Sequence, residues 1–276
     1  MTAGTLFVVA TPIGNLADAS PRSMEVLRTV AVVACEDTRT TRTLLTRNGI
    51  QAKTFALHEH NEQAASATLV AALREGKDVA LVSDAGTPGI SDPGARLVEE
   101  AYRAGVRVSP IPGPSAAVAA LSASGFRASG FFFAGFLPAS GAARRKALQG
   151  LEMPWPVVFF EAPHRIAAML ADLGSQFGGA REICIARELT KKFEETARLR
   201  LEQAPHWLAA DPHREQGEFV IVLAPGEAKS AAASDADRVL DALLDALAPS
   251  EAAKLAARIT GLPKAVLYRK ALERSK

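Results

Sequence analysis

Short apolar runs alternate with helix-like stretches through the first 120 residues, and this alternation is the strongest constraint on the fold. Helix start signals lie between the runs, because Ser20-Pro21 and Asp92-Pro93 each pair an N-capping residue with a proline at the first helical position. Repeated strand–helix units of this kind predict a mainly parallel sheet. The five apolar runs are LFVVA (6–10), AVVAC (31–35), TFAL (54–57), VALVS (79–83) and VRVSPI (106–111).

A second block of strand-like runs follows a proline-rich corner at 110–116. One run, ETARLRL (195–201), alternates polar and apolar residues at period two, which predicts a half-buried antiparallel strand. A second α/β domain is therefore expected after the first. Its other runs are FFFAG (131–135), PVVFFE (156–161), EICIA (182–186) and EFVIVL (218–223).

The end of the chain has a helical pattern. PGEAKSAAASD (225–235) consists mostly of small residues and predicts a linker. Beyond it we expect one helix in DADRVLDALLDAL (235–247) and two short helices around TGLP (260–263), the spacing of a helix-turn-helix. The predicted fold class is α/β, with two α/β domains at 1–117 and 118–226 and a small helical domain at 235–276.

Composition and charge narrow the class of protein. Of the 276 residues, 48% are hydrophobic and 22% charged, as in soluble globular proteins, and no apolar stretch suits a signal peptide or membrane helix. Cys35 and Cys184 fall in strand-like runs, which predicts buried, reduced thiols and a cytoplasmic protein. From Ser250 onward seven basic and two acidic residues give a charge of +5. These residues and ARRK (143–146) are either solvated helix faces or phosphate contacts.

Polar and glycine-rich stretches follow the expected strand ends, where α/β sheets bind ligands. The most unusual is DAGTPGISDPG (84–94), which holds more glycine and proline than a connector needs, with Asp84, Thr87, Ser91 and Asp92 as its polar groups. We therefore expect a ligand in a cleft between the two α/β domains. The other stretches are TPIGN (11–15), EDTR (36–39), PIPGPSA (110–116), EAPHR (161–165) and RELTKKFEE (187–195).

Missing motifs argue against several common activities. The chain has neither G-x-G-x-x-G nor G-x-x-x-x-G-K-[ST], which disfavours nicotinamide and nucleoside triphosphate binding. It has no G-x-S-x-G, which argues against a serine hydrolase. His58 and His60 in HEHNE have no evident third ligand, so no metal is predicted.

The motifs together resemble those of one family. The sequence is similar to the bacterial ribosomal RNA small subunit methyltransferase I family of the tetrapyrrole methylase superfamily. The similarity spans 6–223 in family order and continues in the AAKLAARITGL tail. The matching stretches are VATPIGNLADAS, ACEDTRTTRTLL, ALHEHNEQ, VALVSDAGTPGISDPG, PIPGPSA, FAGFLP followed by RRKAL, FFEAPHR, ARELTKKFEE and GEFVIVL.

The resemblance implies an activity and a cofactor. It implies 2′-O-methylation of a cytidine in the decoding region of small-subunit (16S) ribosomal RNA, with free RNA or the assembled small subunit as substrate. S-adenosylmethionine (SAM) would be the methyl donor, bound between the two α/β domains without a metal, and the protein would be a homodimer. The cofactor contacts carried over by position are Pro12, Ile13, Gly86, Thr87, Ile90, Ser115, Ala116, Phe160, Glu161, Leu189 and Glu218.

Methyl transfer to a ribose hydroxyl needs alignment and a base within hydrogen-bond reach of that hydroxyl. Asp37 is the predicted base or orienting group, with Arg39 holding a phosphate or positioning the carboxylate; a structural ion pair is the alternative. Asn61 in HEHNE is predicted to cap a helix. Further candidates for the base are His58, Glu62, Lys191 and Glu194.

RNA contacts are expected outside the cofactor cleft, at basic side chains. Two rival functions remain at this point: a methylase of the same superfamily acting on a tetrapyrrole or a modified protein side chain, and a DNA-binding regulator whose α/β part senses a ligand. The residues predicted to contact RNA are Arg144, Arg145, Lys146, Lys254, Lys264 and Arg269.

Overall fold

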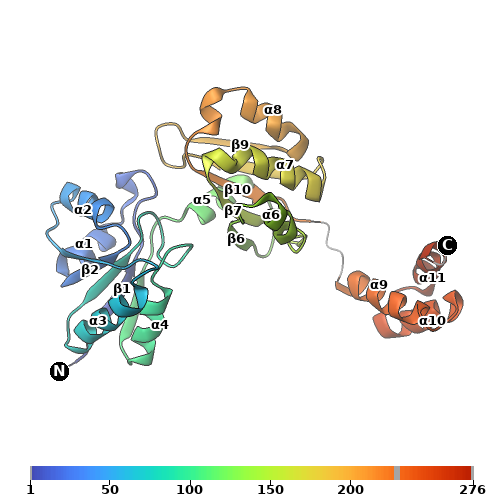
Figure 1. Ribbon diagram of the computed structural model, residues 1–276, viewed down its shortest axis with the longest axis horizontal. Helices are drawn as coiled ribbons and strands as arrows, with labels where there is room; N and C mark the ends of the chain where they lie inside the picture. The colour runs from blue at the N-terminus through green and yellow to red at the C-terminus, as the bar shows by residue number, and fades with distance from the viewer. Residues whose placement is uncertain (1, 227–230, 275–276) are drawn as a thin grey trace. The chain divides into compact units, whose positions relative to one another are not determined.

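The computed structural model describes residues 2–226 and 231–274, which form two compact units (Figure 1). The larger unit comprises Met1–Leu151 and Pro156–Ala224, and the smaller comprises Glu152–Trp155 and Pro225–Lys276. Both α/β blocks belong to the larger unit, so the compact units differ from the three predicted domains.

The first sheet of the larger unit is entirely parallel, with strand order β3-β2-β4-β1-β5. Each strand lies within one residue of the run that predicts it, which confirms the predicted sheet. All four residues of the central β4 are buried, as expected for a strand covered on both faces. The strands are β1 (Thr5–Val9), β2 (Val32–Cys35), β3 (Lys53–Ala56), β4 (Val79–Val82) and β5 (Arg107–Ile111).

Two pairs of helices cover the two faces of this sheet. Leu69 of α3 and Leu97 of α4 pack with Leu81 in one apolar cluster, whereas Leu27 of α1 and Leu45 of α2 belong to the cluster on the other face. The buried Cys35 belongs to the second cluster and is a free thiol, like the buried Cys184, as predicted. The helices are α1 (Pro21–Thr29), α2 (Thr38–Arg47), α3 (Glu62–Arg74) and α4 (Ala95–Arg103).

The helix starts agree only partly with the local sequence signals. The Ser20 hydroxyl caps α1 by accepting from the Ser23 amide at 3.0 Å, as predicted. Asn61 occupies the N-cap position of α3, but its side chain instead accepts from the His58 amide and donates to the Ala56 carbonyl. Asn61 is thus the N-cap residue as predicted, but its side chain does not cap the helix because the preceding loop uses both of its polar atoms.

Helix α4 also starts differently from the prediction. It begins at Ala95, beyond the Asp92-Pro93 pair, and its first amides are capped from another helix. The Glu62 carboxylate of α3 accepts from the Gly94 amide at 2.9 Å and from the Arg96 amide at 3.3 Å. Because Glu62 supplies this cap, the Asp92 carboxylate is not used for it.

The second sheet has strand order β6-β7-β10-β8-β9, with β6 parallel to β7 and the other pairs antiparallel. Residues of β9 alternate between half-buried and exposed, which confirms the predicted half-buried antiparallel strand. Helix α5 (Ala116–Ser124) packs Ala117 and Ala120 against this sheet. The strands are β6 (Phe132–Phe136), β7 (Val157–Glu161), β8 (Glu182–Arg187), β9 (Glu195–Arg200) and β10 (Phe219–Leu223), and the remaining helices are α6 (Gly141–Leu148), α7 (Ile166–Phe177) and α8 (Ala204–Ala209).

The smaller unit is a bundle of α9 (Ala231–Leu244), α10 (Pro249–Thr260) and α11 (Lys264–Arg274) around a core of alanine and leucine. The two helices predicted around TGLP are confirmed, and α10 ends at Gly261 with a φ of 72°. Helix α9 begins at Ala231, inside the predicted linker, of which residues 227–230 lie outside the described residues. Over the described parts of the chain, no helix is both long and apolar enough to cross a membrane.

Candidate active site

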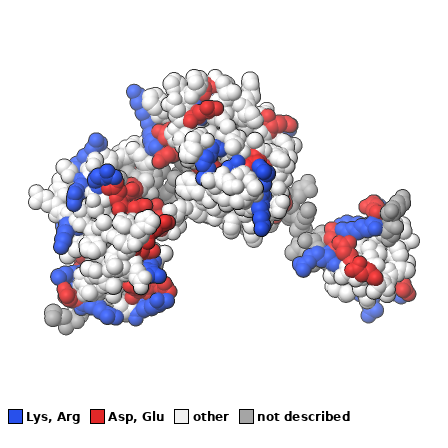
Figure 2. All heavy atoms as spheres, in the orientation of Figure 1, with Lys and Arg blue, Asp and Glu red and all other residues white. Residues whose placement is uncertain are grey.

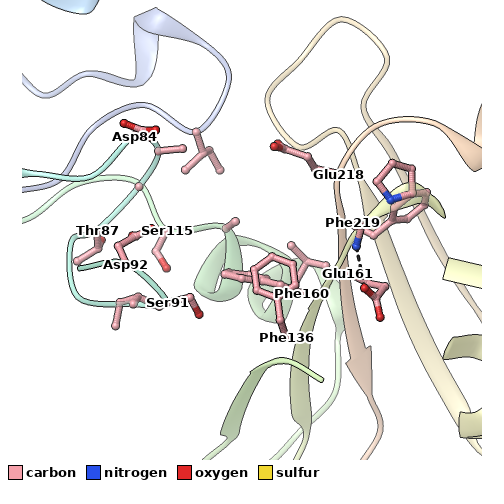
Figure 3. Close-up of a pocket in the computed structure, with 18 residues that line it drawn as sticks. Asp84, Thr87, Ser91, Asp92, Ser115, Phe136, Phe160, Glu161, Glu218 and Phe219 are labelled. Carbon is pink, nitrogen blue, oxygen red and sulfur yellow. Dashed lines mark hydrogen bonds between the residues drawn. The ribbon is translucent and has the colours of Figure 1, made fainter. Parts of the chain in front are cut away.

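The larger unit contains a cavity of about 410 Å³ whose walls come from both α/β blocks (Figure 3). The loop after β4 and the start of α5 form one wall, and the ends of β6, β7 and β10 form the other. Nine of the eleven predicted cofactor residues line it, so the sequence motifs converge on one place. They are Ile13, Gly86, Thr87, Ile90, Ser115, Ala116, Phe160, Glu161 and Glu218.

Two predicted cofactor residues are absent from this lining. Pro12 lines a separate cavity, together with Thr11 and Thr40 among others. Leu189 packs against the apolar cluster on the second sheet. Neither residue lines the larger cavity, and their contacts with the cofactor stay predictions.

The glycine-rich loop is held in a conformation that exposes its backbone to the cavity. The Thr11 and Gly86 backbones exchange two hydrogen bonds, of 2.9 and 3.1 Å, and the Thr87 hydroxyl donates to the Pro114 carbonyl at 3.0 Å. Gly86 has a φ of 85°, and a Cβ there would lie 3.2 Å from the Ile13 side chain. A larger residue at this position would therefore combine backbone strain with crowding of the cavity wall.

Glu161, at the end of β7, has a buried hydrogen-bond acceptor that no described residue satisfies. Its side chain is fully buried, and Oε1 accepts from the Ala162 amide at 2.9 Å and lies 3.0 Å from Nε of Arg165. Oε2 is buried without a partner among the described residues. Buried polar atoms are rarely left unpaired, so this acceptor is an exception, and the fully buried side chain gives a ligand in the cavity no access to it.

Acidic groups dominate the electrostatics of the site. Asp84 and Asp92 line the cavity on the loop after β4, and Glu218 lines the opposite wall (Figure 3). Burial raises the pKa of Asp92 to about 6, and repulsion from Glu36 and Asp84 adds to this effect. No hydrogen bond within the described residues offsets the shift. Asp92 is thus a carboxylate with a raised affinity for protons at the cavity wall.

The predicted catalytic pair, Asp37 and Arg39, lies outside the cavity lining. The Arg39 guanidinium donates to both carboxylate oxygens of Asp37, at 2.7 to 3.1 Å, and the same carboxylate caps α2 through the Arg39 amide. These hydrogen bonds lower the pKa of Asp37 to about 2. The geometry favours the alternative of a structural ion pair, and the choice of Asp37 as base stays a prediction.

Three of the four other candidates for the base are committed elsewhere, and the fourth, His58, has a buried Nδ1 without a partner among the described residues. Glu62 caps α4, and the Lys191 ammonium bonds the carboxylates of Glu188 and Glu218 at 2.8 and 2.7 Å. Glu194 accepts from the Thr190 amide. His58 lies edge-on to His60, with a distance of 6.0 Å between ring centroids. None of these four candidates lines the cavity.

The predicted RNA-contact residues differ in exposure. Arg144 is 5% exposed and its guanidinium lies 2.7 Å from the Asp172 carboxylate, so its prediction as an RNA contact is wrong: the side chain is a buried ion-pair partner. On the face drawn in Figure 2, basic side chains are spread over both units without one dominant patch. The exposed members of the predicted set are Arg145, Lys146, Lys254, Lys264 and Arg269.

Known proteins similar to the chain identify its family. Residues 5–205 match the family described as Tetrapyrrole (Corrin/Porphyrin) Methylases, and residues 230–275 match the RsmI C-terminal HTH domain. Ribosomal RNA small subunit methyltransferase I of Pseudomonas aeruginosa is 50% identical over 99% of both chains. The protein of the same name from Escherichia coli O157:H7 is 45% identical over 98% of this chain and 95% of its own. The chain belongs to the ribosomal RNA small subunit methyltransferase I family.

Solved structures agree with the predicted tetrapyrrole methylase fold. Diphthine synthase has a TM-score of 0.60 at 18% identity, covering 80% of this chain and 89% of that one. Uroporphyrin-III C-methyl transferase from Thermus thermophilus, complexed with S-adenyl homocysteine, has a TM-score of 0.54 at 18% identity, covering 81% of this chain and 97% of its own. At such identities the likeness concerns the fold alone.

Several cavity residues are missing from the set predicted for this family. Asp84, Ser91 and Asp92 were visible as the polar groups of an unusual loop, and that loop was the signal that could have selected them. Phe136 has no comparable signal, because an aromatic residue near the end of an apolar run is ordinary in a strand.

Proposed function

We propose that this chain transfers a methyl group from SAM to the 2′-hydroxyl of a cytidine in the decoding region of small-subunit ribosomal RNA. The observation that carries the proposal is the 50% identity over 99% of both chains to a ribosomal RNA small subunit methyltransferase I. The helical domain lies within this match, so the relationship includes more than the cofactor-binding part of the chain.

The cavity fits SAM by shape and by charge. Its volume lies within the usual range of small-molecule sites, about 300–1,000 Å³. The Gly86 turn leaves room for a close approach between the ligand and the backbone. Asp84 and Asp92 complement the positive charge of a sulfonium donor.

When bound, SAM supplies an activated methyl group, so the chain's own tasks are to hold both substrates in line and to accept a proton. We propose Asp92 as the proton acceptor in place of Asp37. Asp92 lines the cavity and is free of hydrogen bonds within the described residues, whereas the carboxylate of Asp37 is bound by Arg39 outside it. A pKa near 6 leaves the Asp92 carboxylate ionised and basic at neutral pH.

RNA phosphates require a positive surface outside the acidic cavity. Arg39 is suited to this role because its side chain is 88% exposed, and the backbone amide of its partner Asp37 donates to the cavity residue Asp84 at 3.2 Å. We propose Arg39 as a phosphate contact near the acceptor. Arg145, Lys146, Lys254, Lys264 and Arg269 are the further proposed RNA contacts.

We also propose a homodimer in the cytoplasm acting on the RNA or on the assembled small subunit. The decisive experiment incubates the protein and methyl-labelled SAM with small ribosomal subunits from cells that lack it, followed by alkaline hydrolysis of the RNA. Label in an alkali-resistant dinucleotide is the expected result, because a 2′-O-methyl group blocks cleavage at that nucleotide. Label on a base would refute ribose methylation, and absence of label would move the acceptor to another class, such as a tetrapyrrole.

A further inference from the structure

Two large apolar side chains at the cavity are open to solvent, Ile90 and Phe136, and only Phe136 is aromatic. Phe136, the last residue of β6, lines the cavity and is 55% exposed, whereas Phe219 on the same wall is 2% exposed. Exposed apolar surface beside a cavity marks a binding site more often than a single exposed residue elsewhere does. Phe136 therefore needs an explanation beyond packing.

A β-bulge directs this side chain toward the cavity. Residues three apart in a regular strand point to opposite faces of the sheet. In β6 the register shifts between Phe133 and Gly135, which adds one residue and brings Phe133 and Phe136 to the same face. Both rings then contact Phe160 of β7, with centroid distances of 5.0 and 5.6 Å.

The bulge depends on Gly135 and lies against the glycine-rich loop. Gly135 has a φ of 63°, and a Cβ there would lie 3.2 Å from the Ser91 hydroxyl oxygen. Ser91 also has a positive φ, of 69°. Two uncommon backbone conformations from opposite walls thus meet beside Phe136, as expected where a structure fixes the position of a functional side chain.

We propose that Phe136 stacks on the base of the nucleotide that receives the methyl group, an inference that rests on the proposed function. An enzyme acting on a nucleotide within structured RNA must take that nucleotide out of its stack, and aromatic side chains are the usual surface for an unstacked base. The edge-to-face contact with Phe160 holds the ring, while more than half of the residue stays open for a partner.

The position of Phe136 favours a base over the cofactor as its partner. A folded RNA cannot enter a cavity of about 410 Å³, so only a single extruded nucleoside can reach the site, and it must arrive at the open side. Phe136 is on that open side, whereas the buried Glu161 and the half-buried Phe160 belong to the enclosed part.

Three substitutions separate stacking from packing. Phe136→Ala removes the ring, Phe136→Leu keeps apolar volume against Phe160 without an aromatic face, and Phe136→Trp restores one. Tyr102→Ala is the matched control, because Tyr102 is 65% exposed on α4 and does not line the cavity. The readouts are kcat/KM for small subunits at saturating SAM, and the affinity for S-adenosylhomocysteine measured by calorimetry.

The Ala and Leu variants should both lose roughly 5- to 150-fold in kcat/KM for subunits, the range measured for loss of one stacked base. Phe136→Trp should recover most of the rate, and the affinity for S-adenosylhomocysteine should stay within about twofold in every variant. Unchanged kinetics in the Ala variant, or a rate restored by Leu, would overturn the inference and leave the function intact. A matching loss of S-adenosylhomocysteine affinity would assign the ring to the cofactor instead. Absence of transfer by the wild-type protein would refute the function itself, and the inference with it.

Discussion

Substitution of Asp92 by Asn tests two things: whether Asp92 is the catalytic base, and how much its ionised carboxylate lowers the stability of the fold. Asn has nearly the same shape but cannot accept the proton, so kcat should fall about 100-fold or more, the scale of general base catalysis. Because a base acts in its ionised form, wild-type kcat/KM should rise with pH through about 6 and then level off. The variant should show no such rise. Methyl transfer to small subunits from about pH 5 to pH 8 measures both effects.

The same substitution should make the protein more stable. A pKa raised from 3.8 to about 6 means that folding disfavours the ionised carboxylate, so stability falls as pH rises between these values and the penalty is complete above about pH 6. Two units of pKa correspond to about 3 kcal/mol, and the partial solvent exposure of Asp92 reduces this to about 1–2 kcal/mol. Asp92→Asn should therefore exceed the wild type by about 1–2 kcal/mol at pH 8, and by less at pH 4.5, in urea unfolding.

Asp37→Asn is the matched control, because its effects should have the opposite pattern. The pKa of Asp37 is lowered by Arg39, so its ionised form stabilises the fold at neutral pH and its loss should reduce stability there. The Asp37→Asn variant should methylate small subunits at saturating SAM at close to the wild-type rate. If Asp92→Asn retained the rate and its pH dependence, Asp92 would not be the base. If it were less stable than the wild type at pH 8, the account of burial and repulsion would be wrong.

Four further variants test the scaffold and the RNA contacts. Arg144→Ala should destabilise the protein by about 3–5 kcal/mol in urea unfolding, because it leaves the Asp172 carboxylate buried without its closest partner. Lys146→Ala should change stability little, but it should reduce the salt dependence of RNA binding by about one charge. Gly86→Ala should weaken S-adenosylhomocysteine binding in calorimetry, since the added Cβ meets Ile13 and requires a strained φ. Removal of residues 225–276 should weaken RNA binding without changing S-adenosylhomocysteine affinity, and a parallel loss of both would show that these residues complete the fold of the larger unit.

The strands follow from local sequence and the helix starts do so only in part, whereas the chemistry at the cavity depends on distant contacts. Each apolar run became a strand, because only burial in a sheet satisfies its side chains and backbone together. The Asp92-Pro93 pair is a local signal for a helix N-cap. Asp92 is not used as the cap, because Glu62, thirty-two residues before Gly94, accepts the hydrogen bond of the Gly94 amide. Arg144 has the sequence context of an exposed helix, and its burial depends on Asp172, twenty-eight residues later.

The charges of the site impose different routes on the two substrates. Asp84 and Asp92 make the cavity attractive to a cationic donor and repulsive to phosphate. RNA phosphates must therefore be held outside, by exposed groups such as Arg39, while only the uncharged base and ribose enter. Phe136 places an apolar ring at the opening, where the ring can stack on the uncharged base and does not repel it. It follows that added salt should weaken binding of the subunit far more than it weakens binding of the donor, because only the former depends on many exposed charges.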